Sequence, residues 1–196
     1  MSYQTIYTEL ASLANQAKTI GENLNKELEL NMSRYIGDLL QEKNAKVDSE
    51  VKTQIASLAS RAQDELNTGL SDYQRYLDAN YFASITPNEA AEIDMIANSN
   101  LDIDEVKAYF RKFSGNKTLL RRLEKIATDS GFLVLGRTYR GELDFMNSVK
   151  NAGQDVVNAI QSGETMRLSI AINYLAGKVK EYDTFSAKET QVIEKQ

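Results

Sequence analysis

The stretch QTIYTELASLANQAKTIGENL, residues 4–24, carries an apolar side chain at every third or fourth position. These positions are Ile6, Leu10, Leu13, Ala17, Ile20 and Leu24. Alternating steps of four and three residues keep such side chains on one face of a helix, as in a coiled coil. The pattern continues less regularly as far as Leu39. It predicts a long helix over residues 4–41, whose apolar face must be covered by another helix.

A second apolar stripe predicts another long helix, over residues 47–79. The intervening stretch QEKNAKVDSE, residues 41–50, holds only one strong apolar residue, and we expect a turn near residues 43–46. Two long helices joined by a short connection favour an antiparallel hairpin. The alternative is one uninterrupted rod that continues through residue 45.

Three helix-capping signals follow in the middle of the chain. TPNE, residues 86–89, has the pattern of a capping box with proline at the first helical position. Asp102 with Glu105 forms a second box, and Asn116 can cap a third helix after a break that contains glycine. These signals predict a compact module of three short helices over residues 86–131.

Two further helices are predicted near the C-terminus, over residues 142–161 and 165–182, from apolar residues at helical spacing. The preceding segment FLVLGRTY, residues 132–139, favours β structure, but a lone strand has no evident partner in this sequence. We therefore expect this segment to be buried irregular chain. The polar end, residues 183–196, is expected to fray.

The predicted fold class is all-α: a long helical hairpin or coiled coil, a compact module of three short helices, and two C-terminal helices. One proline and ten glycines in 196 residues are few helix breakers. The predicted parts are residues 1–80, 81–135 and 136–196. No apolar run approaches the roughly 20 residues of a membrane span, and no secretory leader is evident. We expect no membrane partner.

The composition excludes several kinds of chemistry, because the chain contains neither cysteine nor histidine. Catalysis by Ser-His-Asp or Cys-His groups requires imidazole. The usual zinc and non-haem iron sites require imidazole or thiolate ligands. We therefore predict a non-enzymatic protein with no catalytic residue, no metal site and no cofactor.

Positive charge is concentrated in residues 107–140, which hold nine basic residues and two acidic ones, although the whole chain has a net charge of −5. The predicted binding face comprises Lys117, Arg121, Arg122 and Lys125 on the third short helix, with Arg111 and Lys112 on the preceding one. A spacing of four residues puts Lys117, Arg121 and Lys125 on one side of the helix.

Three interpretations of this basic face are open. Two helices joined by a short glycine-containing turn match the spacing of a helix-turn-helix, so the face could contact DNA. It could equally be an ordinary solvated helix face, or it could dock on the acidic long hairpin of its own chain. Asymmetry of charge indicates a surface for phosphate or for an acidic partner.

A group of aromatic residues occurs where the long hairpin enters the module. Tyr73, Tyr76 and Tyr81 are candidate interface anchors, because buried tyrosines contribute strongly to many binding surfaces. The alternative is that they form the core joint between two packed parts of the chain.

Residues 80–132 also carry a family resemblance. The Thr86 cap, the helix start at Leu101-Asp102, and the run GN…LRRLEKIA with a closing glycine resemble the C-terminal part of small helical proteins encoded by phages of Gram-positive bacteria. The resemblance implies a phage protein that acts by binding, and it transfers no catalytic residue.

The resulting functional expectation is a phage-encoded binding protein in virion assembly, as a scaffold, core or connector component. It would bind a phage structural or host protein, form homo-oligomers, and occur in the host cytoplasm or the virion. One alternative is an inhibitor that binds a host defence protein. Another is a helix-turn-helix-like regulator that binds nucleic acid.

Overall fold

The structure is a computed structural model that describes residues 2–188 and 190–194. Helices predominate over this part of the chain, and one small antiparallel sheet accompanies them, so the all-α prediction is confirmed. The chain divides into two compact units. Unit 1 comprises residues 1–71 and 148–180, and unit 2 comprises residues 72–147 and 181–196.

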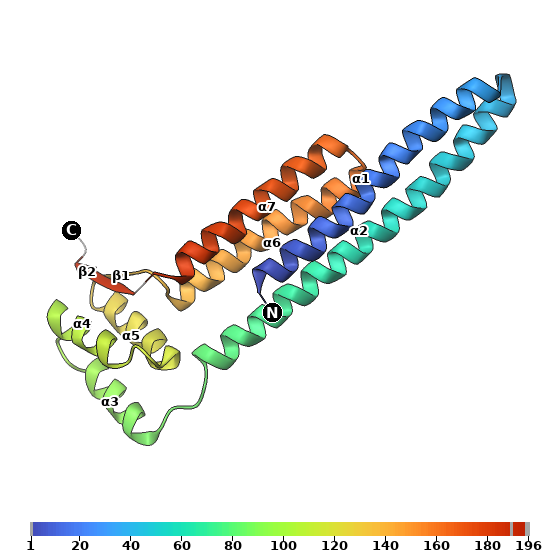
Figure 1. Ribbon diagram of the computed structural model, residues 1–196. Coiled ribbons are helices and arrows are strands. Elements are labelled where there is room, and N and C mark those ends of the chain that lie inside the picture. Colours follow the sequence, from blue (N-terminus) through green and yellow to red (C-terminus); the bar gives the residue numbers. More distant parts are fainter. Residues whose placement is uncertain (1, 189, 195–196) are drawn as a thin grey trace. The chain divides into compact units, whose positions relative to one another are not determined.

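Unit 1 is built from long helices that run side by side (Figure 1). Helix α1 (Tyr3–Arg34) and helix α2 (Gly37–Tyr81) form an antiparallel hairpin. Helix α6 (Tyr139–Ser162) and helix α7 (Thr165–Ser186) form a second, shorter hairpin. The α2, α6 and α7 helices also contribute residues to unit 2.

The seam predicted at the start of the chain lies in the core of unit 1, where Leu10 and Leu66 are fully buried. Two glycines allow the helices to approach closely. A Cβ atom added at Gly69 would lie 2.4 Å from Ile6 Cγ1, and one at Gly153 would lie 2.6 Å from Leu66 Cδ1. Real Cβ atoms do not approach other atoms so closely. Both close approaches therefore require glycine, which has no side chain, at positions 69 and 153.

The turn of the long hairpin lies at Tyr35 and Ile36, so the prediction of a turn at residues 43–46 was wrong. Gly37 begins α2 with a φ of 58°, a conformation that glycine adopts without strain and that reverses the chain. The polar stretch 41–50 instead belongs to the exposed first part of α2, where charged residues lie one helical turn apart. A hydrogen bond from Asn31 Nδ2 to Asn44 Oδ1, at 3.0 Å, joins the two arms.

Unit 2 contains the three predicted short helices, α3 (Pro87–Ala97), α4 (Ile103–Lys112) and α5 (Lys117–Asp129). Their caps are confirmed. The Thr86 and Asp102 side chains form capping boxes with Glu89 and Glu105, and Asn116 accepts a hydrogen bond from the Leu119 amide. The apolar residues between these caps form one core, which comprises Ile93, Ile96, Val106, Phe110, Phe113, Leu119, Leu123, Ala127 and Val192.

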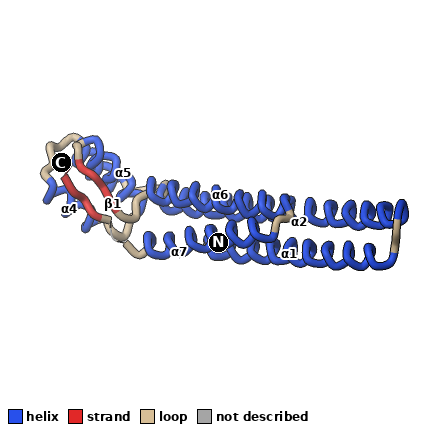
Figure 2. The backbone as a smooth tube through the Cα atoms, turned by 90° about the horizontal axis from the view of Figure 1, so that it is seen from above, coloured by secondary structure: helices blue, strands red, loops and turns tan. Residues whose placement is uncertain are grey.

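The segment after α5 differs from the expectation. Residues Phe132–Leu135 form strand β1, which pairs antiparallel with strand β2 (Gln191–Glu194), as Figure 2 shows. The predictions of irregular chain at residues 132–135 and of a frayed end were therefore wrong for these segments. The partner is only four residues long and follows two helices later, so local sequence patterns do not reveal it. Val192 packs into the core of unit 2 and explains why the pairing forms.

The two C-terminal helices exist as predicted, although α7 continues to Ser186, beyond the expected end at residue 182. Within the described ranges, no helix combines the length and the apolar character that a membrane crossing requires.

Candidate functional site

A cavity of about 810 Å³ opens in unit 2 beside α4, α5 and the segment that leads into β2. We call it the cationic cleft, because six basic residues line it. They are Lys107, Arg111, Lys117, Arg121, Arg137 and Lys188. Among the lining residues that the structure describes, Glu124 is the acidic one. The cleft thus gathers positive charge from three separate stretches of the sequence.

The predicted basic face divides between the cleft and the surface outside it. Arg111, Lys117 and Arg121 line the cleft. Lys112, Arg122 and Lys125 do not. Lys112 forms an ion pair with Glu92, and Lys125 is exposed. Lys107, Arg137 and Lys188 were absent from the predicted face. Lys107 and Arg137 lie in the basic stretch of residues 107–140. Lys188 lies far from this stretch in the sequence, so no local pattern pointed to it.

Two of the predicted residues are held in place by the end of α2. Lys117 Nζ donates to the Tyr76 hydroxyl at 3.0 Å, and its ammonium lies 5.4 Å from the ring centre of Tyr81. Arg121 Nε donates to the Tyr81 carbonyl at 2.9 Å, and its guanidinium lies 4.0 Å from the ring centre of Phe82. These contacting groups are neutral, so they orient both cations without cancelling their charge.

The three aromatic candidates, Tyr73, Tyr76 and Tyr81, differ in their burial. Tyr73 and Tyr81 are buried in unit 2, and Tyr76 is partly exposed while it binds Lys117. Tyr81 packs on Tyr139 with ring centres 5.2 Å apart. Burial raises the pKa of the Tyr81 phenol, and the nearby Glu142 raises it further. Tyr73 and Tyr81 therefore belong to the core of unit 2, whereas Tyr76 stays accessible at its surface.

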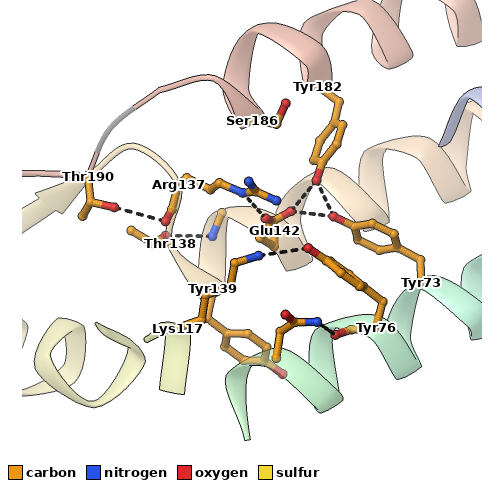
Figure 3. A network of polar contacts seen from close by, with 12 residues as sticks. Tyr73, Tyr76, Lys117, Arg137, Thr138, Tyr139, Glu142, Tyr182, Ser186 and Thr190 are labelled. Atoms are coloured by element: carbon orange, nitrogen blue, oxygen red, sulfur yellow. Dashed lines mark hydrogen bonds and ion pairs between the residues drawn. The ribbon is translucent and has the colours of Figure 1, made fainter. Parts of the chain in front are cut away.

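A buried carboxylate, which sequence reasoning missed, lies next to the cleft (Figure 3). Glu142, at the start of α6, has no solvent exposure. Its Oε2 accepts hydrogen bonds from the Tyr73 hydroxyl at 2.6 Å and the Tyr182 hydroxyl at 3.0 Å. Its Oε1 accepts from Arg137 Nε at 2.7 Å. Since Arg137 also lines the cleft, this cluster fixes one of the cleft's cations.

The cluster and the cleft shift the pKa values of their members. Burial lowers the pKa of Arg137, but the hydrogen bond and charge of Glu142 outweigh that effect and raise it overall. Burial raises the pKa of the Tyr182 phenol, which keeps it a neutral donor. Burial likewise raises the pKa of Glu124, although the Tyr139 amide donates to this carboxyl at 3.3 Å. A protonated Glu124 carries no negative charge, so protonation removes its opposition to the positive charge of the cleft.

A second candidate surface lies in unit 1, at the end of the long hairpin. A Cβ atom at Gly21 would lie 3.8 Å from the Gly163 carbonyl oxygen, so the α6–α7 turn lies beside α1 at Gly21. Beyond that point α1 and α2 continue without α6 and α7 (Figure 1). We call residues 30–39 the hairpin end. Its exposed apolar side chains are Leu30, Met32, Ile36 and Leu39.

Chemically, the cleft offers a cluster of cationic hydrogen-bond donors, and the hairpin end offers apolar surface. Over the described part of the chain, no group of three or more acidic side chains is placed to hold a metal ion. Comparison with protein-family models, with curated protein sequences and with solved structures finds no match to this chain.

Proposed function

We propose that this chain is a non-enzymatic helical binding protein of phage origin that serves in virion assembly, as a scaffold, core or connector component. The observation that carries the proposal is the apolar hairpin end, where Ile36 is 88% exposed and Met32 is 61% exposed. These exposed apolar side chains lie within ten residues of one another, and we take them as the mark of an interaction site because water disfavours them. The hairpin end is therefore the surface through which the protein binds its partner.

The partner that fits this surface is a second copy of the chain. A two-fold interface requires a self-complementary patch, in which each group meets its opposite on the other copy. Both kinds of charge lie close to these apolar residues in the sequence: Arg34 and Asp38 belong to the hairpin end, and Glu42 and Lys43 follow it on α2. Two hairpin ends can thus bury their apolar side chains together while opposite charges pair at the edges.

The alternative of a DNA-binding regulator receives less support. A recognition helix needs its basic face free for the major groove. Lys117 and Arg121 are instead half-buried and hold Tyr76, Tyr81 and Phe82 of their own chain.

Sedimentation velocity over a range of micromolar concentrations tests the proposal. We expect the wild type to form oligomers, and the double variant Ile36→Ser/Met32→Ser to associate at least about tenfold more weakly, because burial of each large apolar side chain is worth about 1.5–3 kcal/mol. The matched control is Met166→Ser/Ile170→Ser, which removes two exposed apolar side chains from α7. The control should associate as the wild type does.

Two outcomes contradict the proposal. If the α7 variant, rather than the hairpin-end variant, loses association, then the interface lies on α7. If the wild type remains monomeric at every concentration, the chain does not self-associate, and the alternative of an inhibitor that binds a host defence protein is favoured.

A further inference from the structure

We propose that the cationic cleft of unit 2 is a binding site for a phosphorylated small molecule of nucleotide size. The inference concerns unit 2 alone and does not depend on association through the hairpin end. It rests on the cleft's volume, its charge, the fixed orientation of its cations and the apolar residues beneath them.

The volume suits a small molecule. Pockets for small ligands and cofactors usually enclose about 300–1,000 Å³. The cleft measures about 810 Å³. A nucleic acid or a folded protein partner would instead require an extended surface.

The charge selects an anion. Six basic residues line the cleft against one described acid. Arg137 and Lys107 form ion pairs with Glu142 and Asp104, and the other four basic residues still leave a positive excess at the walls. Arg111 and Lys188 are exposed and can reach a ligand without breaking an ion pair that the structure describes. Arginine offers a planar fork of N–H donors that matches the oxygens of a phosphate group. Two or more phosphate charges would balance the cations best.

Part of the site is already organised. The contacts of Lys117 and Arg121 with the end of α2 fix these two side chains, and Glu142 fixes Arg137 (Figure 3). An anion that binds there does not have to order these long side chains, so less conformational entropy is lost on binding. Neutral partners hold Lys117 and Arg121, so their charges remain available to the ligand.

The base of the cleft favours a ligand with an apolar part as well as phosphate. Phe110 and Val192 are buried, Leu120 is partly buried, and all three line the cavity. Tyr139 adds a half-buried aromatic ring. Bases stack on aromatic side chains in many nucleic-acid-binding proteins. A nucleotide combines both chemistries, whereas inorganic phosphate supplies only the anion.

Isothermal titration of the full chain with adenosine diphosphate, guanosine diphosphate and pyrophosphate tests the proposal. We expect a nucleoside diphosphate to bind with one-to-one stoichiometry and more tightly than pyrophosphate. Arg111→Gln and Lys188→Gln should each weaken this binding about tenfold, since each removes one charge-assisted contact. These residues are exposed, so both variants should keep the far-ultraviolet circular dichroism of the wild type.

The matched controls are Lys112→Gln and Lys125→Gln, which remove the same charge from α4 and α5 outside the cleft. They should bind within about twofold of the wild type, because exposed charges at a distance are screened by salt.

Four results would overturn the proposal. Nucleoside diphosphates that fail to bind at millimolar concentration would show that the cleft is not such a site. Equal weakening by the lining and the control variants would show diffuse attraction. Binding of a short DNA duplex that all four substitutions weaken, without nucleotide binding, would identify the basic face as a nucleic-acid surface. Pyrophosphate binding as tight as nucleotide binding would refute the role of the apolar base.

Discussion

Replacing the buried carboxylate by its amide, Glu142→Gln, should destabilise unit 2 strongly. The wild-type carboxylate accepts three hydrogen bonds, from Tyr73, Tyr182 and Arg137, and it is fully buried. An amide has one acceptor oxygen, and its NH₂ group would face at least one donor. Arg137 would also lose the counter-charge that it has in the described structure while staying partly buried.

The expected cost follows from that geometry. Removal of one partner from a buried ion pair costs about 3–5 kcal/mol, because the other charge stays buried without compensation. The Arg137 side chain is 29% exposed, so water can compensate it in part. We therefore expect a loss near the lower limit, about 3 kcal/mol.

Urea denaturation monitored by circular dichroism measures this loss as a lower midpoint at an unchanged slope. The matched control is Asp144→Asn, which removes an exposed acid two residues away on α6 and should change stability by less than about 0.5 kcal/mol. A loss below about 1 kcal/mol for Glu142→Gln would refute the reasoning, since it would show that Glu142 does not compensate the charge of Arg137.

Two further predictions concern other parts of the chain. Gly69→Ala should lower the free energy of unfolding by about 1–3 kcal/mol, because its Cβ would overlap Ile6. The control Gly177→Ala places its methyl group in open space and should raise the free energy of unfolding by about 0.5–1 kcal/mol through helix propensity. If thermal unfolding shows that Gly69→Ala stabilises the protein, the close approach of Ile6 to Gly69 is contradicted. Glu124→Gln should stabilise the protein at neutral pH, because burial raises the pKa of Glu124 above its ordinary value of 4.5. The contribution of protonated Glu124 to the free energy of unfolding is fully present below pH 4.5 and is lost as pH rises through the folded-state pKa. The difference in free energy of unfolding between variant and wild type should therefore vanish below pH 4.5. If urea denaturation shows that this difference in free energy of unfolding grows below pH 4.5 instead, the raised pKa of Glu124 is refuted.

Local signals in the sequence predicted the short helices well. The capping patterns at Thr86, Asp102 and Asn116 depend on residues within one helical turn of each other, and all three caps form. The turn of the long hairpin was misplaced because the local pattern at the true turn looks helical. Apolar residues at Tyr35 and Ile36 continue a helical pattern, and only the positive φ of the glycine that follows reveals the reversal.

Features that join distant segments could not be predicted in this way. The pairing of β1 with β2 and the Glu142 cluster each bring together residues from separate helices or strands. The cleft itself was not predicted, although Arg111, Lys117 and Arg121, which line it, belong to the predicted basic face because they lie in one continuous basic stretch. Lys188 joins them only through the tertiary fold, which places the C-terminal segment beside α4 and α5.

The order of the two units along the chain has a consequence for synthesis. Unit 1 begins, is interrupted by most of unit 2, and is completed only by parts of α6 and α7; unit 2 in turn needs β2, which follows α7. Multi-domain chains commonly fold one domain after another as they leave the ribosome. Here unit 1 has all its residues only when most of α7 has been made, and unit 2 only when β2 follows, so neither unit can be completed much before the other. For the same reason, a single cut anywhere in the backbone releases no fragment that contains one whole unit and nothing else.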